Sequence, residues 1–124
     1  NLDGAVVAVW GLTFKANTDD LRGSPALAVI ERLLALGAVV RAWDPTVATP
    51  HALLPEGLEL GNDPYAVCED ADVLAVLTEW DETRWLDARK VAELLRRCTV
   101  VDARNILDRS EWRRAGFEHQ GIGR

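Results

Sequence analysis

The residues best suited to chemistry gather in one polar segment near the start of the chain. Residues 11–25 read GLTFKANTDDLRGSP and combine an aromatic ring, Phe14, with two cations, Lys15 and Arg22. A cation can attract a diphosphate, and an arginine can bind an anion through two hydrogen bonds, while the ring packs against a base or sugar face. The segment therefore predicts a binding site for a nucleotide-like ligand.

Each of these side chains also has a structural interpretation that stays open at this stage. Lys15 could be solvated beside a half-buried Phe14. Arg22 could pair with Asp19 or Asp20 across the loop instead of binding an anion. The two adjacent carboxylates could suggest metal or acid–base work, but they are more typical of caps and ion-pair partners.

Other candidates follow later predicted strands. Arg104 comes directly after a strand and could direct its guanidinium at a phosphate, or form a salt bridge with Asp102 or Asp108. Trp80 and Trp85 flank another loop, where indoles could stack on a ligand but are more often packing residues.

The remaining reactive side chains form no catalytic pattern. His51 and His119 are isolated from any arrangement that would define a triad. Cys68 and Cys98 have no metal-ligand or redox spacing, so we expect two structural thiols. The sequence predicts no catalytic residue and no metal site.

The elements around residues 11–25 are strongly apolar. Residues 5–10 read AVVAVW, which is typical of a buried strand. Ser24 and Pro25 look like the N-cap and first residue of a helix over 25–36, and a second strand is predicted at 39–43. The polar segment thus leaves the carboxyl end of a buried strand, where open α/β sheets bind ligands.

Alternating strands and helices continue to the end of the chain. The patterns predict a helical turn at 49–54, an edge strand at 58–60, a short helix at 64–69, a strand at 72–78, a helix at 87–97, a strand at 99–101, a helix at 110–115 and an extended piece at 117–122. This alternation predicts an α/β, Rossmann-like three-layer sandwich with a mainly parallel sheet and helices on both faces. Four loops would then share one sheet edge: 11–23, 44–45, 79–84 and 102–105.

Length and charge narrow the class of protein. A chain of 124 residues fits a single domain over residues 1–124. A net charge of −6 argues against binding to nucleic acid or an anionic membrane. There is no apolar run of about 20 residues and no signal-peptide pattern at the N-terminus, so we expect a cytoplasmic protein.

Five motifs, taken in order, resemble one known family. GLTFKANTDDLRGSPAL, AWDP, LTEWDETR, VDARNILD and GFEHQGIGR are similar to the C-terminal, UDP-binding domain of the UDP-glucose/GDP-mannose dehydrogenase family, and most of all to its UDP-glucose enzymes. The resemblance covers nearly the whole chain. It implies a domain that binds a UDP-sugar within an NAD-dependent oxidoreductase that converts UDP-glucose to UDP-glucuronate, a reaction of nucleotide-sugar metabolism and polysaccharide biosynthesis.

The resemblance also implies roles for four residues. Phe14 and Lys15 match the family's substrate-binding pair, Arg104 matches a substrate-binding arginine, and Arg22 matches an arginine that reaches NAD. One departure is Ala103, which stands where the motif usually has glycine. If this position needs a positive φ, alanine would strain the loop and displace Arg104.

Several parts of a family member are not in this chain. The NAD-binding domain, with its GxGxxG fingerprint, the central dimerisation domain and the catalytic cysteine would all come from elsewhere in the same polypeptide, so this chain alone should be inactive. The resemblance also implies that the full-length protein is a homo-oligomer. Two alternatives remain: a non-catalytic module for domain packing or oligomerisation, suggested by five tryptophans, or a different substrate such as GDP-mannose or a UDP-N-acetyl-hexosamine.

Overall fold

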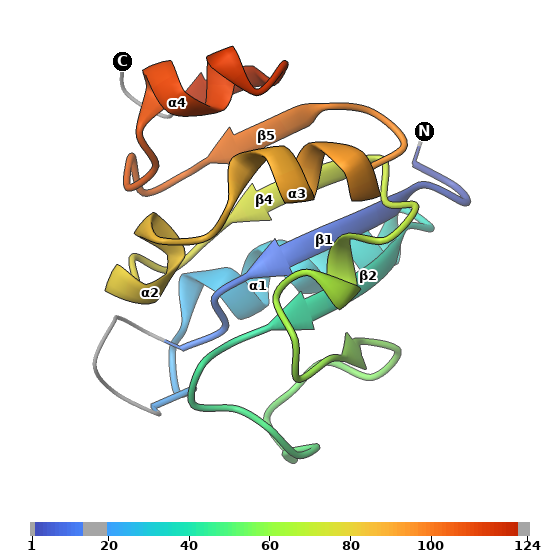
Figure 1. Cartoon of the computed structure of the whole chain (residues 1–124). Coiled ribbons are helices and arrows are strands. Elements are labelled where there is room, and N and C mark those ends of the chain that lie inside the picture. Colours follow the sequence, from blue (N-terminus) through green and yellow to red (C-terminus); the bar gives the residue numbers. More distant parts are fainter. Residues whose placement is uncertain (1, 14–19, 122–124) are drawn as a thin grey trace.

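Parallel strands form one six-stranded sheet (Figure 1). The computed structural model describes residues 2–13 and 20–121. The strands are β1 (Val6–Trp10), β2 (Val39–Trp43), β3 (Glu59–Leu60), β4 (Val73–Val76), β5 (Thr99–Asp102) and β6 (Glu118–Gly121). Their order is β3-β2-β1-β4-β5-β6, and every neighbouring pair is parallel. This is the strand order of doubly wound sheets, and it confirms the predicted α/β, Rossmann-like class.

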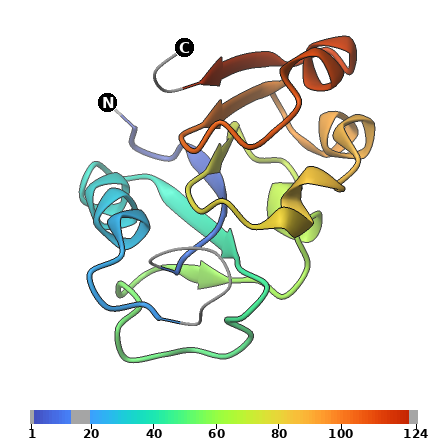
Figure 2. The same ribbon diagram turned by 90° about the vertical axis from the view of Figure 1, so that its left-hand side faces the viewer.

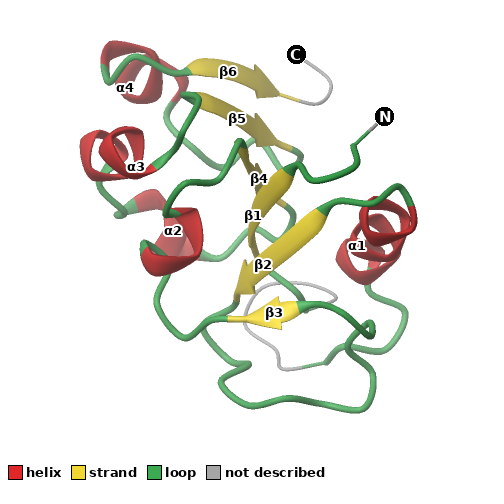
Figure 3. Ribbon diagram, turned by 90° about the vertical axis from the view of Figure 1, so that its right-hand side faces the viewer, coloured by secondary structure: helices red, strands yellow, loops and turns green. Residues whose placement is uncertain are grey.

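Helices cover both faces of the sheet. They are α1 (Pro25–Ala35), the 3-10 helix η1 (Ala66–Cys68), α2 (Asp81–Arg84), α3 (Ala88–Leu94) and α4 (Arg109–Arg114). Figure 3 shows α1 on one side of the sheet and α2, α3 and α4 on the other. Among the described residues, no helix has the length and apolar character needed to cross a bilayer.

The apolar core divides into two clusters because successive side chains of a strand point to opposite faces. In β1, Val7 and Val9 pack on the side of α1, whereas Ala8 and Trp10 pack on the side of α3 and α4. Trp10 meets Trp112 of α4 edge-to-face, with ring centroids 6.0 Å apart. The central strand is therefore buried on both faces, as its uninterrupted apolar sequence predicted.

Several local predictions differ from the structure. The helix predicted at 64–69 is only the 3-10 helix η1, and the strand predicted at 72–78 is the shorter β4. Residues 49–54 form turns and bends instead of a helical turn, and the single turn α2 was not predicted. Helix α3 ends at Leu94, earlier than the predicted residue 97, because Leu95 is extended and the Arg96 N–H donates to the Ala71 carbonyl at 2.8 Å. A tertiary hydrogen bond thus replaces what would have been the next helical one.

Candidate functional site

Four loops meet at the carboxyl end of the sheet (Figure 2). Trp10 at the end of β1 lies opposite Trp43 of β2 and Val76 of β4, and Val76 lies opposite Asp102 of β5. The strands therefore end side by side, and the loops that follow them share one edge. This confirms the predicted gathering of the four loops.

A buried carboxylate connects three of these loops. Asp44, at the end of β2, is only 3% exposed. Its Oδ2 accepts hydrogen bonds from the Leu12 N–H at 2.8 Å, the Thr13 N–H at 3.1 Å and the Trp80 indole N–H at 3.3 Å. Its Oδ1 accepts from the Thr46 N–H at 2.9 Å. Asp44 follows β2 directly, next to the end of β1. Its hydrogen bonds to the Leu12 and Thr13 N–H groups therefore fix the start of the loop after β1.

A tight turn begins that loop. Gly11 has a φ of +103°, and its N–H donates to the Trp43 carbonyl at 2.8 Å. A Cβ on Gly11 would lie 2.5 Å from the Thr78 Cβ and 2.6 Å from the Thr78 nitrogen. The glycine therefore serves close packing against the end of β4.

Arg22 lies near the other end of the same loop. Its guanidinium pairs with Asp20 at 3.1 Å, and its side chain is 83% exposed. Hydrogen bonds from the Arg22 side chain and N–H hold the pKa of Asp20 below its ordinary value. The ion pair that the sequence left open is thus formed with Asp20. Phe14 and Lys15 lie outside the described residues, so their assignments stay predictions.

Ser24 occupies the predicted N-cap position but uses its hydroxyl differently. Its side chain makes no capping hydrogen bond. Instead, the buried Ser24 Oγ donates to the Leu12 carbonyl at 2.7 Å. The start of α1 therefore ties back to the same loop peptide that Asp44 contacts.

A second buried carboxylate organises the loop after β5. Asp102 accepts from the Leu107 N–H at 2.8 Å and the Arg104 N–H at 3.2 Å. The Arg104 guanidinium reaches across to Glu79 at 2.9 Å, and its side chain is 46% exposed. The predicted alternative partners of this guanidinium were Asp102 and Asp108, but its ion pair is with the loop after β4.

The strain expected at Ala103 is absent. The non-glycine residues with positive φ in the described part of the chain are Asp70 and Asn105, and the value at Asn105 is 56°. The left-handed position of this turn therefore lies two residues beyond Ala103, on a residue type that tolerates it. Alanine at 103 does not displace Arg104 through backbone strain.

His119 is a buried residue that the sequence did not single out for this end of the sheet. Its imidazole lies on β6 with Nε2 at 3.5 Å from the Asp102 Oδ2, and both side chains are completely buried. Within residues 2–13 and 20–121, neither ring nitrogen makes a hydrogen bond. No local pattern indicates this proximity, because it depends on the pairing of β5 with β6.

The two tryptophans near the site have different roles. Trp80 is 4% exposed and donates its indole N–H to Asp44, so it is a packing residue. Trp85, at the end of α2, is 83% exposed. The favoured packing role is therefore confirmed for Trp80, whereas the Trp85 indole is not buried in this way.

The thiols agree with the predicted structural role. Cys68 is buried, and burial raises its pKa to about 12. A thiol with that pKa is almost entirely protonated near neutral pH and is a poor nucleophile. Cys98 is partly buried, and its thiol lies 3.6 Å from the Ala92 carbonyl.

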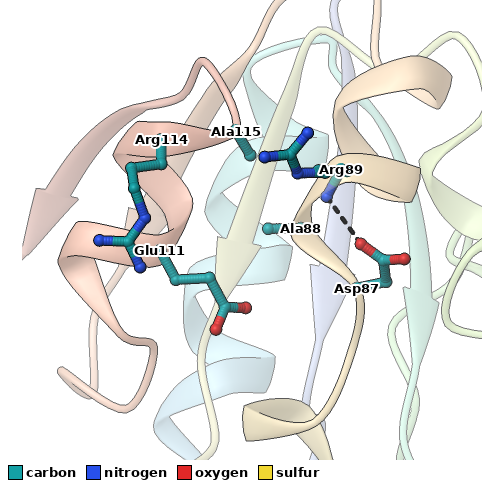
Figure 4. A pocket seen from close by; sticks show the side chains of 6 residues that line it. All are labelled: Asp87, Ala88, Arg89, Glu111, Arg114 and Ala115. Atoms are coloured by element: carbon teal, nitrogen blue, oxygen red, sulfur yellow. Dashed lines mark hydrogen bonds between the residues drawn. The ribbon is translucent and has the colours of Figure 1, made fainter.

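A separate hollow of about 280 Å³ lies between α3 and α4 (Figure 4). Its charged lining consists of Asp87, Arg89, Glu111 and Arg114, and the Asp87 carboxylate caps α3 by accepting from the Arg89 N–H at 3.0 Å. Two carboxylates balance two guanidinium groups, which gives no net attraction for an anion. The strand ends are the better candidate site.

Comparison with known proteins agrees with the resemblance of the five motifs. The family model for the UDP-glucose/GDP-mannose dehydrogenase family, UDP binding domain, matches residues 8–109. The chain belongs to this family. The UDP-glucose 6-dehydrogenase of Rhizobium meliloti is 42% identical over 124 residues, and TuaD, the UDP-glucose 6-dehydrogenase of Bacillus subtilis, is 40% identical over 126. Both alignments cover 100% of this chain.

A solved structure of the family has the same fold. The UDP-D-ManNAc dehydrogenase of Pyrococcus horikoshii superposes with a TM-score of 0.81 at 31% identity, over 99% of this chain and 26% of its own. This chain spans 28% of the Rhizobium relative and 27% of the Bacillus relative. The family's dehydrogenases are therefore much longer than the sequence described here.

Proposed function

We propose that this chain is the UDP-sugar-binding domain of a nucleotide-sugar dehydrogenase, with Phe14, Lys15 and Arg104 as substrate-binding residues. The observation that carries the proposal is the meeting of four loops at the carboxyl end of the sheet, where the loops after β1 and β5 are each held by a buried aspartate. Open α/β sheets bind ligands at this edge, outside the carboxyl ends of the strands. The half-exposed Arg104 guanidinium there can meet a phosphate.

The complete protein would oxidise UDP-glucose to UDP-glucuronate with NAD. Its NAD-binding and central dimerisation domains would belong to the same polypeptide, outside residues 1–124, and the assembled enzyme would be a homo-oligomer. We assign no catalytic residue to this chain and expect it to be inactive alone. The buried Cys68, whose pKa is raised to about 12, supports that assignment. The cytoplasmic location also stays a prediction.

We expect NAD to bind outside the first turn of this domain. Gly11 packs against Thr78, and the sequence after β1 lacks the glycines that admit a pyrophosphate. We propose instead that NAD binds mainly to the NAD-binding domain outside residues 1–124, and that Arg22 faces the NAD across the cleft between the two domains. The high exposure of the Arg22 side chain supports this role.

The sugar could differ from glucose. The Pyrococcus relative is named a UDP-D-ManNAc dehydrogenase, which keeps a UDP-N-acetyl-hexosamine as an alternative substrate, with GDP-mannose as another. The packing or oligomerisation alternative is supported by Trp85, whose indole is 83% exposed. Sedimentation tests that alternative, because a strictly monomeric chain that binds nucleotide would disfavour it.

Titration calorimetry with UDP, UDP-glucose and GDP tests the proposal. We expect saturable binding of the uridine ligands, and a loss of about tenfold in affinity for Lys15→Ala and for Arg104→Ala, because each removes a charge-assisted contact to phosphate. Lys90→Ala and Arg89→Ala are the matched controls, since both side chains lie on α3. Unchanged affinity in Lys15→Ala and Arg104→Ala would contradict the assigned residues. Absence of uridine-ligand binding in the unmodified chain would contradict the proposed function.

A further inference from the structure

Side chains from three other segments hold the two peptides that precede Phe14. The Leu12 and Thr13 N–H groups donate to the Asp44 carboxylate, the Leu12 carbonyl accepts from Ser24 Oγ, and the Thr13 carbonyl accepts from Thr78 Oγ1 at 3.0 Å. These partners come from the end of β2, the start of α1 and the end of β4. Sheet pairing of β1 stops at Trp10, so side chains take over where the strand ends.

Asp44 is the member of this arrangement that serves both peptides and a third loop. Its Oδ2 accepts from Leu12, Thr13 and Trp80, so one oxygen joins the loops after β1 and β4. Its other oxygen accepts from the Thr46 N–H at 2.9 Å and the Thr46 hydroxyl at 2.8 Å. A buried carboxylate is costly unless several donors surround it, and here the donors belong to the loops themselves.

We propose that Asp44 is a positioning residue that holds the Leu12 and Thr13 peptides at the carboxyl end of the sheet and joins them to the loops after β2 and β4, and so determines the affinity of this edge for a uridine diphosphate. This inference rests on the proposed function. Aspartate is required because both of its carboxylate oxygens accept from backbone N–H groups. An asparagine would either place its NH2 group against the Leu12 and Thr13 N–H groups or, if flipped, against the Thr46 N–H.

Asp44→Asn tests the inference, with Asp72→Asn as the matched control. Asp72 makes the equivalent contact at the other end of the sheet, where it accepts from the Val6 N–H at 2.9 Å. At a temperature where both variants are folded, we expect Asp44→Asn to weaken UDP binding about tenfold or more and to remove hydrogen-exchange protection at Leu12 and Thr13. Asp72→Asn should lower stability while leaving UDP affinity and the protection of these two amides unchanged.

Two further variants keep the test decisive if Asp44→Asn does not fold. Trp80→Phe removes one donor to Asp44 and should weaken UDP binding by about threefold, and Thr78→Val removes the hydroxyl that holds the Thr13 carbonyl and should do the same. Wild-type UDP affinity in a folded Asp44→Asn, or in both of these variants, would overturn the inference. If the unmodified chain does not bind UDP, the proposed function fails, while protection at Leu12 and Thr13 still shows whether Asp44 positions the loop.

Discussion

The carboxyl and amino ends of the sheet both contain aspartates that accept hydrogen bonds from backbone amides, but the two ends bury them differently. At the carboxyl end, Asp44 is 3% exposed and Asp102 is completely buried. At the amino end, the Asp72 side chain is 20% exposed and pairs with Arg96 at 3.1 Å. The buried pair accepts from amides of the loops that follow the strands, whereas Asp72 accepts from Val6, the first residue of β1.

From this difference we infer that the carboxyl end of the sheet is the end that binds ligand. A carboxylate that bonds to the first amide of a strand stabilises that strand and can be replaced at a cost in stability alone. A carboxylate that bonds to successive loop amides determines a loop conformation that the strands do not. Substitutions at the carboxyl end should therefore change ligand binding as well as stability.

The largest expected effect comes from the glycines at the two ends of β1. Gly4 and Gly11 both have positive φ, but an added Cβ at Gly4 meets nothing within 4 Å, whereas at Gly11 it meets the Thr78 backbone. We expect Gly11→Ala to lower the free energy of unfolding by about 3–4 kcal/mol, through strain and overpacking together. Gly4→Ala should cost about 1–2 kcal/mol, through strain alone. Urea unfolding measures both, and equal losses would show that the close packing at Gly11 is unimportant.

The next largest effect concerns Asp102. Asp102→Ala leaves the Leu107 and Arg104 amides without their acceptor, so we expect a loss of about 2–3 kcal/mol in the free energy of unfolding, together with weaker UDP binding. Asp72→Ala, at the amino end, should lower the free energy of unfolding by about 1 kcal/mol, because water can replace part of the interactions that Asp72 makes. Denaturant unfolding combined with UDP titration measures both effects. An Asp102→Ala variant with wild-type UDP affinity would contradict the expectation that substitutions at the carboxyl end change ligand binding.

The smallest effect is the dependence of stability on pH that Asp72 introduces. The Val6 N–H and the nearby Arg96 hold the pKa of Asp72 below its ordinary value of 3.8. Its stabilising contribution is therefore present above that ordinary value and is lost as the pH falls through the lower folded-state pKa. Unfolding curves between neutral pH and pH values below 3.8 should show this loss in the wild type and a smaller loss in Asp72→Asn. Parallel curves for the two proteins would contradict the assignment.

The sequence predicted the fold class and most elements because its apolar runs are unambiguous. The strand at Val39–Trp43 was predicted with its observed bounds, and the helix from Pro25 was predicted to within one residue of its end. Strand order was beyond prediction, because an alternating pattern does not say on which side of β1 the chain crosses. The helical turn predicted at 49–54 does not form, because the prolines at 50 and 55 favour turns there.

The site was only partly predictable. The ends of the strands, with Arg22 and Arg104, could be located because polar residues interrupt apolar runs. The contacts that Asp44 and His119 make with distant segments could not be predicted. In the sequence, Asp44 with Pro45 is typical of a turn, and its partner amide at Leu12 is 32 residues away. Contacts of this kind become visible only when the parallel register brings distant loops together.

Amide chemical-shift mapping of this chain during a UDP titration shows directly which end of the sheet binds the nucleotide. We expect saturable shifts at the carboxyl end of the sheet, at Leu12 and Thr13 and in the turn over residues 103–105, with no change at Val6, Asp72 or Arg96. Shifts centred on the amino end, or a spectrum that does not respond to UDP, would contradict this expectation.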